Sequence, residues 1–283
     1  MHKNDYLNDP NDYVFKSMAS LEENSQHPYI MDVFNDAFAR TKGIIGIVYS
    51  LIKDRNVSID NYVLSKLRIT CYGARNLFIS TLLSKLKRME AVFDTNDKSN
   101  IILVMNEKGK SISLDSKDAS KKDSVVGFSY IHDPLDRIYI KTDSLTLNSR
   151  STMPTWERNR EIQKKIKNLS NIMCHESVHA LGTPEDYFYH NSIDEGEYDT
   201  IENTLIRTEI ALRRGRGVND AFINMCTLYF MSNPVYQTFE LNSLLQPETL
   251  GLLFQYDDYL RALILINNPD TITVVINDLA TLG

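Results

Sequence analysis

The pattern of apolar positions predicts helices in the first third of the chain. From Met31 to about Ala91 apolar residues recur at intervals of three and four, in "VFNDAFARTKGIIGIVYSLI", "NYVLSKL" and "NLFISTLLSKLKRMEAV". This spacing places the apolar side chains on one face of a helix and the polar side chains on the other. We therefore expect two or three amphipathic helices in this part of the chain.

A longer helix, of about 20 residues, is expected from near Thr155 to Leu181. Its apolar positions trace one face, and these are Ile162, Ile166, Leu169, Met173 and Val178. Gly182 and Pro184 then interrupt the pattern, because glycine favours the conformation that ends a helix and proline cannot continue one. A further helix is expected from about Ile201 to Arg214.

Between these helices the chain changes to short runs of β-branched and aromatic residues. The runs are "NIILVMNE", "SISL", "SVVGFSYIH" and "RIYIKTDSL", with turn residues such as "NEKGK" and "HDPLD" between them. They predict a small, mixed or mostly antiparallel sheet over about residues 100–146. Residues 137–143, "RIYIKTD", fit either an edge strand to which an extended substrate adds or an internal strand. After residue 219 the chain is expected to be mostly helical, with "TITVVIND" ambiguous between helix and strand.

Composition and charge limit the kind of protein this can be. The 283 residues suffice for one large domain with a sizeable core, which we place at residues 29–283. Residues 1–28 are rich in Asn, Asp, Ser and Lys, which is typical of a flexible leader such as a secretion signal. The formal net charge of −6 argues against a nucleic-acid partner, and no apolar stretch approaches the roughly 20 residues of a membrane span.

The N-terminal residues and the cysteines bear on the compartment. The stretch "MHKNDYLNDPNDYVF" lacks the apolar core of a Sec signal peptide, so we expect the protein to stay in the cytosol or to leave by another route. The three cysteines, Cys71, Cys174 and Cys226, are too few and too scattered for a disulfide framework or a cysteine-based zinc site. We expect them to be reduced.

The clearest chemical signal is "HESVH" at residues 175–179. His175 and His179 are one helical turn apart, so both imidazoles project from the same face, as two ligands of a tetrahedral zinc ion must. Glu176 is close to that face, where a carboxylate can hold a water molecule and take its proton without binding the metal. The pattern predicts a zinc-dependent peptidase with Zn²⁺ as cofactor, His175 and His179 as ligands and Glu176 as general base.

The third zinc ligand is less clear from the residues alone. After the helix stop in "GTPED", a carboxylate three or four residues later can turn back to the metal, which makes Glu185 and Asp186 candidates. Glu202, on the next expected helix, is a third candidate, and His190 is also within reach along the sequence. Ligand chemistry and loop geometry favour Asp186 without deciding the choice.

The stretch "HESVHALGTPED" resembles the zinc-binding segment of the NleC-like type III secreted zinc metalloprotease effectors, to which the PipA, GogA and GtgA effectors are related. "MPTW", Met153 to Trp156, and "TIENTLIRTEIALRRG" are similar to the segments that flank the site in that family. The resemblance covers about residues 151–216 and is only general elsewhere. The length before "MCHESVH" is greater here than in the family, so the alignment of that helix is not clean.

The resemblance implies a fold and a set of site residues. It implies an α+β, zincin-like protease domain, with a small sheet, an active-site helix and mostly helical flanking regions. Asp186 is then the third zinc ligand, and Glu202 is a candidate to accept a hydrogen bond from the second ring nitrogen of a histidine ligand. A tyrosine also approaches the metal in the family; Tyr229 is the candidate here, although its local sequence does not match. Trp156, the only tryptophan, is expected to pack against the domain.

The resemblance also implies a biological role. It predicts a monomeric bacterial virulence effector, exported by a signal-peptide-independent route such as type III secretion into the host cytoplasm. There it would cut host NF-κB (Rel-homology) proteins such as p65 and suppress inflammatory signalling, without a nucleic-acid or membrane partner. The net charge and the acidic "DEGEYD" loop suit a basic substrate surface. The alternatives are another host target, such as a signalling kinase or a membrane-fusion protein, and a binding module that does not cut.

Overall fold

The computed structural model of the chain describes residues 13–17, 28–94, 100–106, 127–129, 137–141, 154–181, 200–216 and 220–283. By its contacts the chain divides into two compact units. The first consists of Met1–Gly43, Arg88–Gly182 and Ile193–Gly196, and the second of Ile44–Lys87, Thr183–Ser192 and Glu197–Gly283. The described residues are mostly helical. Among the helices of these ranges, none is long and apolar enough to span a membrane.

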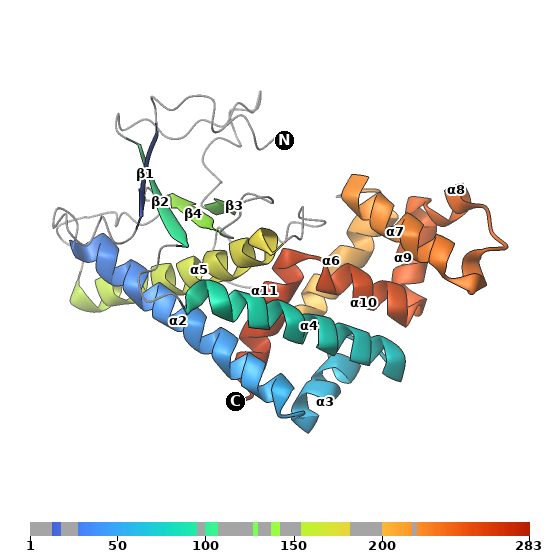
Figure 1. The fold of residues 1–283 in the computed structure, drawn as a ribbon, viewed down its shortest axis with the longest axis horizontal. Coiled ribbons are helices and arrows are strands. Elements are labelled where there is room, and N and C mark those ends of the chain that lie inside the picture. The colour runs from blue at the N-terminus through green and yellow to red at the C-terminus, as the bar shows by residue number, and fades with distance from the viewer. Residues whose placement is uncertain are drawn as a thin grey trace. The chain divides into compact units, whose positions relative to one another are not determined.

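The first unit contains a four-stranded sheet (Figure 1). Its strands are β1 (Tyr13–Ser17), β2 (Ile101–Asn106), β3 (Gly127–Ser129) and β4 (Ile138–Lys141). Their order is β1-β2-β4-β3, with β2 and β4 parallel and the two outer pairs antiparallel. The sheet is therefore mixed, and β4 is an internal strand rather than an edge strand.

The residues of β4 explain its internal position. Ile138, Tyr139 and Ile140 are all buried, so both faces of the strand are covered. Ile138 and Ile140 pair with Ile101 and Leu103 of β2, and Tyr139 pairs with Phe128 of β3 on the other side. β-branched and aromatic side chains of this kind suit a strand that is covered on both faces.

Strand β1 lies within the segment that composition assigns to a leader. Tyr13–Ser17 pairs antiparallel with β2, with Tyr13 opposite Asn106 and Ser17 opposite Ile102. The rest of that leader lies outside the described residues, apart from Pro28, which begins helix α2 (Pro28–Lys53). The flexible leader and the single domain over residues 29–283 stay predictions.

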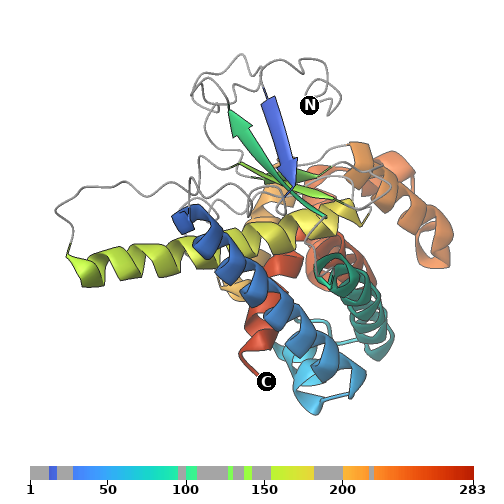
Figure 2. The same cartoon turned by 60° about the vertical axis from the view of Figure 1, so that its left-hand side comes forward.

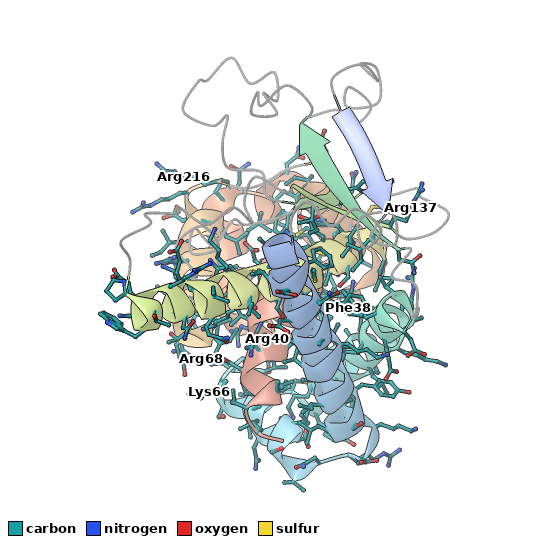
Figure 3. The ribbon with its side chains drawn as sticks, turned by 90° about the vertical axis from the view of Figure 1, so that its left-hand side faces the viewer. Phe38, Arg40, Lys66, Arg68, Arg137 and Arg216 are labelled. Atoms are coloured by element: carbon teal, nitrogen blue, oxygen red, sulfur yellow. The ribbon has the colours of Figure 1, made fainter. Side chains whose placement is uncertain are left out.

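Three helices form where the first apolar pattern predicts them. They are α2, α3 (Val57–Ser65) and α4 (Tyr72–Phe93). The first unit takes residues 28–43 of α2 and 88–93 of α4, and the second unit takes the remainder. Within the first unit Phe38 of α2, labelled in Figure 3, meets Phe93 of α4 edge to face, with ring centroids 5.6 Å apart.

Helix α5 (Thr155–Ala180) carries the candidate site and confirms the expected helix over 155–181. It contacts strands β3 and β4 of the same unit, and Figure 1 shows it along one face of the sheet. From Ile166 onward nearly every residue of α5 is buried, whereas no residue before Ile166 is. Burial is thus confined to the C-terminal part of this helix.

The second unit is helical in its described residues. Its remaining helices are α6 (Ile201–Arg213), α7 (Asp220–Ser232), a 3₁₀ turn at Pro234–Tyr236, α8 (Leu241–Leu244), α9 (Pro247–Tyr256), α10 (Asp258–Ile266) and α11 (Pro269–Ala280). Helix α6 packs on α9 at Gly251, where a Cβ atom would lie 2.2 Å from Cγ of Arg213. Only glycine permits this close approach.

The segment "TITVVIND", ambiguous in sequence, lies in helix α11. Residues 269–276 are all buried, so the helix is covered on every side. A helix that is buried on every side has no clear division between a buried and an exposed face, so its sequence does not distinguish it from a buried strand. Pro269 in the first turn favours the helix, because its fixed φ suits that position and no hydrogen bond is lost there.

Candidate metal centre

The candidate site lies on the enclosed part of α5. His175, Glu176 and His179 are buried, with 6%, 8% and 5% of their surface exposed. Burying three ionisable side chains on one helix is unfavourable unless each is paired or bound. The burial therefore sets these residues apart from an ordinary polar helix face.

The two histidines converge as the spacing predicts. Their Nε2 atoms are 3.0 Å apart, and their ring centroids are 4.8 Å apart with an interplanar angle of 69°. Two imidazole nitrogens on one tetrahedral zinc ion lie roughly 3.3 Å apart, given Zn–N distances of about 2.0–2.1 Å. The pair thus fits a shared zinc ion with little adjustment.

The third ligand cannot be placed from the described residues. Asp186, Glu185 and His190 all lie outside them. Among the residues that the structure does describe, no group of three or more His, Cys, Asp or Glu side chains gathers in a metal-binding arrangement. The described part of the site therefore supplies two candidate ligands and one carboxylate, and Asp186 stays a prediction.

Glu202 lies near the start of α6 in the second unit. Its Oε1 atom is 2.5 Å from Nζ of Lys66, and both side chains are partly exposed. The hydrogen bond from Lys66 lowers the pKa of the Glu202 carboxyl, so that side chain is ionised near neutral pH. Its predicted role as hydrogen-bond partner of a zinc-bound histidine stays a prediction.

Tyr229 lies on α7 of the second unit. Its hydroxyl donates to Oδ2 of Asp257 at 2.7 Å, and the hydroxyl of Tyr236 donates to the same oxygen. Burial and then the bond to Asp257 raise the pKa of Tyr229 above its ordinary value. Asp257 also caps α10 through its other oxygen, so the described partners of Tyr229 are structural. A role of Tyr229 at the metal stays a prediction.

Two contacts hold the site helix in its unit, and the sequence pattern gave no indication of either. The hydroxyl oxygen of Thr41 in α2 lies 2.9 Å from the hydroxyl oxygen of Ser170, and both side chains are fully buried. At the other end of the site, Nη1 of Arg88 in α4 donates to the carbonyl oxygen of Leu181 at 2.9 Å. A cation at the C-terminus of a helix offsets the partial negative charge there. Arg88 thus fixes the point at which the chain leaves the site helix.

Cys71, Cys174 and Cys226 are all free cysteines. Cys174, which precedes His175, is buried, and the hydroxyl of Ser177 donates to its backbone carbonyl at 2.7 Å. Burial raises the pKa of Cys226 to about 12, so this thiol stays protonated. Cys71 is exposed.

The prediction that Trp156 packs against the domain is wrong, because 67% of its surface is exposed. Trp156 is the second residue of α5, and the first residue of this helix to be buried is Ile166. Packing of the helix begins about three turns beyond the tryptophan, so no described side chain encloses the indole.

Comparisons of the chain with protein-family models, with curated proteins and with solved structures found no match.

Proposed function

We propose that this protein is a zinc-dependent endopeptidase with a zincin-like α+β fold. The observation that carries the proposal is the convergence of His175 and His179, whose buried Nε2 atoms are 3.0 Å apart beside the buried Glu176. A histidine pair in a merely structural helix would not need a neighbouring buried carboxylate. In a zinc peptidase each of the three has a separate task.

The proposed ligands are His175, His179 and Asp186. The first two are supported by their geometry, and the third by the resemblance of "HESVHALGTPED" to the NleC-like effectors. Arg88 donates a hydrogen bond to the carbonyl oxygen of Leu181, which precedes the segment that contains Asp186. This bond supports a fixed chain direction at the end of the helix. Glu202 remains the proposed hydrogen-bond partner of a zinc-bound histidine. Tyr229 remains the proposed tyrosine that also approaches the metal.

Zinc, when bound, would polarise the scissile carbonyl and lower the pKa of a water molecule towards neutrality. The residues of the chain would perform the proton transfers. Glu176 would hold the attacking water by a hydrogen bond and take its proton as general base. The same carboxyl would then give that proton to the leaving amine. Burial of Glu176 favours this role, because it keeps competing water away from the carboxylate.

The sheet offers a place for an extended substrate. Strand β3 lies at an edge of the sheet and contacts α5, which carries the histidines. Its outer side pairs with no other strand among the residues that the structure describes. A peptide that adds to this edge would gain main-chain hydrogen bonds and run beside the site helix. The sequence left residues 137–143 open between this role and an internal strand; because β4 is internal, the candidate strand is β3.

The biological role rests on the resemblance. We propose a virulence effector that reaches the host cytoplasm by a signal-peptide-independent route, such as type III secretion, and cuts NF-κB subunits such as p65. The net charge of −6 supports a basic substrate surface. We also propose that the protein is a monomer and has no nucleic-acid or membrane partner.

The test measures zinc and cleavage separately. We expect one zinc per chain by mass spectrometry, loss of zinc in His175→Ala and His179→Ala, and cleavage of purified p65 by the native chain. Glu176→Gln should retain zinc and lose cleavage. Glu157→Gln is the matched control, since it removes an exposed carboxylate from the same helix. Absence of zinc would refute the proposal. Bound zinc together with uncut p65 would refute only the proposal that p65 is a substrate.

The same preparations test Glu202. Removal of a side chain that holds a zinc ligand typically lowers metal affinity about 10–100-fold. We therefore expect Glu202→Gln to weaken zinc binding by that factor if the proposed role is right. An unchanged affinity would leave Glu202 as the partner of Lys66 alone.

A further inference from the structure

The first three turns of α5 project beyond the packed part of their unit. No residue from Thr155 to Lys165 is buried, whereas Ile166 and almost all later residues are. Figure 2 shows these turns extending past the N-terminal end of α2, with no other described helix or strand of the unit beside them. A helix half in which no residue is fully buried contributes little to the core, so its exposed side chains are available to a partner.

One face of this helix half combines an aromatic side chain with cations. Trp156, Arg160, Lys164 and Lys167 are at positions i, i+4, i+8 and i+11, which lie along one side of a helix. All four side chains are exposed. Among the described residues, none forms an ion pair with the three cations. We call these four residues the α5 stripe.

The charge of this segment is opposite to that of the chain. Residues 155–167 contain five basic and two acidic side chains, a net charge of +3, in a protein whose net charge is −6. By contrast, residues 217–283 contain seven acidic side chains and one basic side chain. The α5 stripe is therefore a local positive site on a negative protein, which attracts anionic groups to one place.

The stripe is rigidly connected to the candidate metal centre. Lys164 precedes His175 by eleven residues, about three full turns, so the two lie on the same side of the helix about 16 Å apart along its axis. Trp156 lies about 28 Å from His175 along the axis by the same rise. An extended peptide covers these distances in about five to nine residues.

We infer that the α5 stripe is a docking site for an acidic segment of the substrate protein, with Trp156 as the anchor for an apolar side chain of that segment. The inference rests on the proposed peptidase function for its partner. The carboxylates of the segment pair with Arg160, Lys164 and Lys167, and the segment lies about five to nine residues from the bond that is cut. Exposed tryptophan side chains are frequent anchors at protein interfaces.

Charge and composition favour a protein segment over nucleic acid or membrane. A nucleic acid or an anionic membrane is larger than the stripe, so it would also experience the net charge of −6 of the protein, which would repel it. A membrane-bound helix also needs a broad apolar face, whereas the only large apolar side chain in the stripe is Trp156. A short acidic peptide contacts the stripe alone.

The single tryptophan makes the test direct, because all tryptophan emission comes from Trp156. The Glu176→Gln chain is titrated with a fluorescein-labelled peptide of sequence Glu-Asp-Glu-Leu-Phe-Asp-Glu-Asp. We expect anisotropy to show binding, unlabelled peptide to shift the emission to the blue, and high salt to weaken the binding. Trp156→Ala and the triple variant Arg160→Glu, Lys164→Glu, Lys167→Glu should each lower the affinity about tenfold or more.

The matched control changes the same amount of charge elsewhere. It is the triple variant Arg40→Glu, Lys87→Glu, Arg216→Glu, whose side chains are exposed (Arg40 and Arg216 are labelled in Figure 3). The control should bind the peptide as the native stripe does. Equal weakening in both triple variants, or no binding at all, overturns the inference. So does a blue shift with a DNA oligonucleotide or with phosphatidylserine vesicles but not with the peptide.

Cleavage assays separate this inference from the proposed function. In the active chain, stripe variants should raise KM for the protein substrate about tenfold and leave kcat unchanged, because uniform binding is lost. A substrate of about six residues, too short to reach the stripe, should be cut equally by all variants. Cleavage with unchanged KM overturns the inference and leaves the peptidase. Peptide binding without zinc or cleavage overturns the peptidase and leaves an acidic-peptide site.

Discussion

The hydrogen bond between Thr41 and Ser170 connects helix α2 to the site helix five residues before His175. The Thr41 hydroxyl is 2.8 Å from the carbonyl oxygen of Ala37 and 2.9 Å from the hydroxyl of Ser170. A threonine hydroxyl has one hydrogen to donate. Because the Ala37 carbonyl is its nearest acceptor, we expect Thr41 to donate to Ala37 and Ser170 to donate to Thr41. This assignment makes the two residues unequal when each is replaced.

The expected decreases in the free energy of unfolding follow from this difference between Thr41 and Ser170. Thr41→Val keeps the shape of the side chain but leaves the buried Ser170 donor without its acceptor, which should lower the free energy of unfolding by about 1–3 kcal/mol. Ser170→Ala leaves the bond from Thr41 to Ala37 intact and should cost about 1 kcal/mol or less. In the double variant neither polar group remains, so its loss should be smaller than the sum of the single losses.

Urea unfolding followed by far-ultraviolet circular dichroism measures these values. Tryptophan fluorescence is a poor probe of unfolding here, because Trp156 is already exposed in the folded state. Neither substitution touches a proposed zinc ligand, so zinc content should stay at one per chain in all variants. Losses that add within about 0.5 kcal/mol would show that the two hydroxyls are not coupled and would refute the reasoning.

Three further predictions concern other contacts. Arg88→Met should lower zinc affinity about tenfold in chelator competition, because the Leu181 carbonyl loses its donor, and Arg88→Lys should restore part of the loss; equal affinities would contradict this. Gly251→Ala should lower thermal stability because its Cβ meets a side chain, whereas Gly43→Ala, with open space around it, should raise stability. Burial raises the pKa of Asp258, but the hydroxyl and backbone hydrogen bonds that it accepts outweigh burial and lower it overall. Its stabilising effect should therefore be present at neutral pH and lost as the pH falls below about 4, and Asp258→Asn should remove that part of the acid dependence of urea unfolding.

The predicted helices depended on local patterns, and those patterns were sufficient except in α11, where the segment "TITVVIND" was ambiguous. Helix α5 begins at Thr155, as expected, and ends at Ala180, one residue before the predicted end. Strand β1 shows what a local pattern does not contain. Tyr13–Ser17 lies in a polar segment, and its partner β2 is almost 90 residues away. Nothing within the segment itself indicates that partner, so composition alone suggested a leader.

The candidate site divides in the same way. The positions of His175, Glu176 and His179 follow from helix periodicity, and the structure brings the two imidazoles together as that periodicity requires. Thr41 and Arg88 could not be predicted, because each reaches α5 from a helix more than 90 residues away in the chain. The position of Asp186 depends on the path of a turn, which has no periodicity.

The two halves of α5 have the same helical pattern and opposite surroundings. Six polar residues of the C-terminal half are buried, and these are Ser170, Asn171, His175, Glu176, Ser177 and His179. Burial of so many polar side chains would be unfavourable if the helix served the core alone, so a binding role is the simplest reason for them to be there. The N-terminal half poses the opposite problem, since it exposes the only tryptophan of the chain. Each half departs from what a core helix needs, and a peptidase that docks its substrate beside the metal accounts for both departures with one helix.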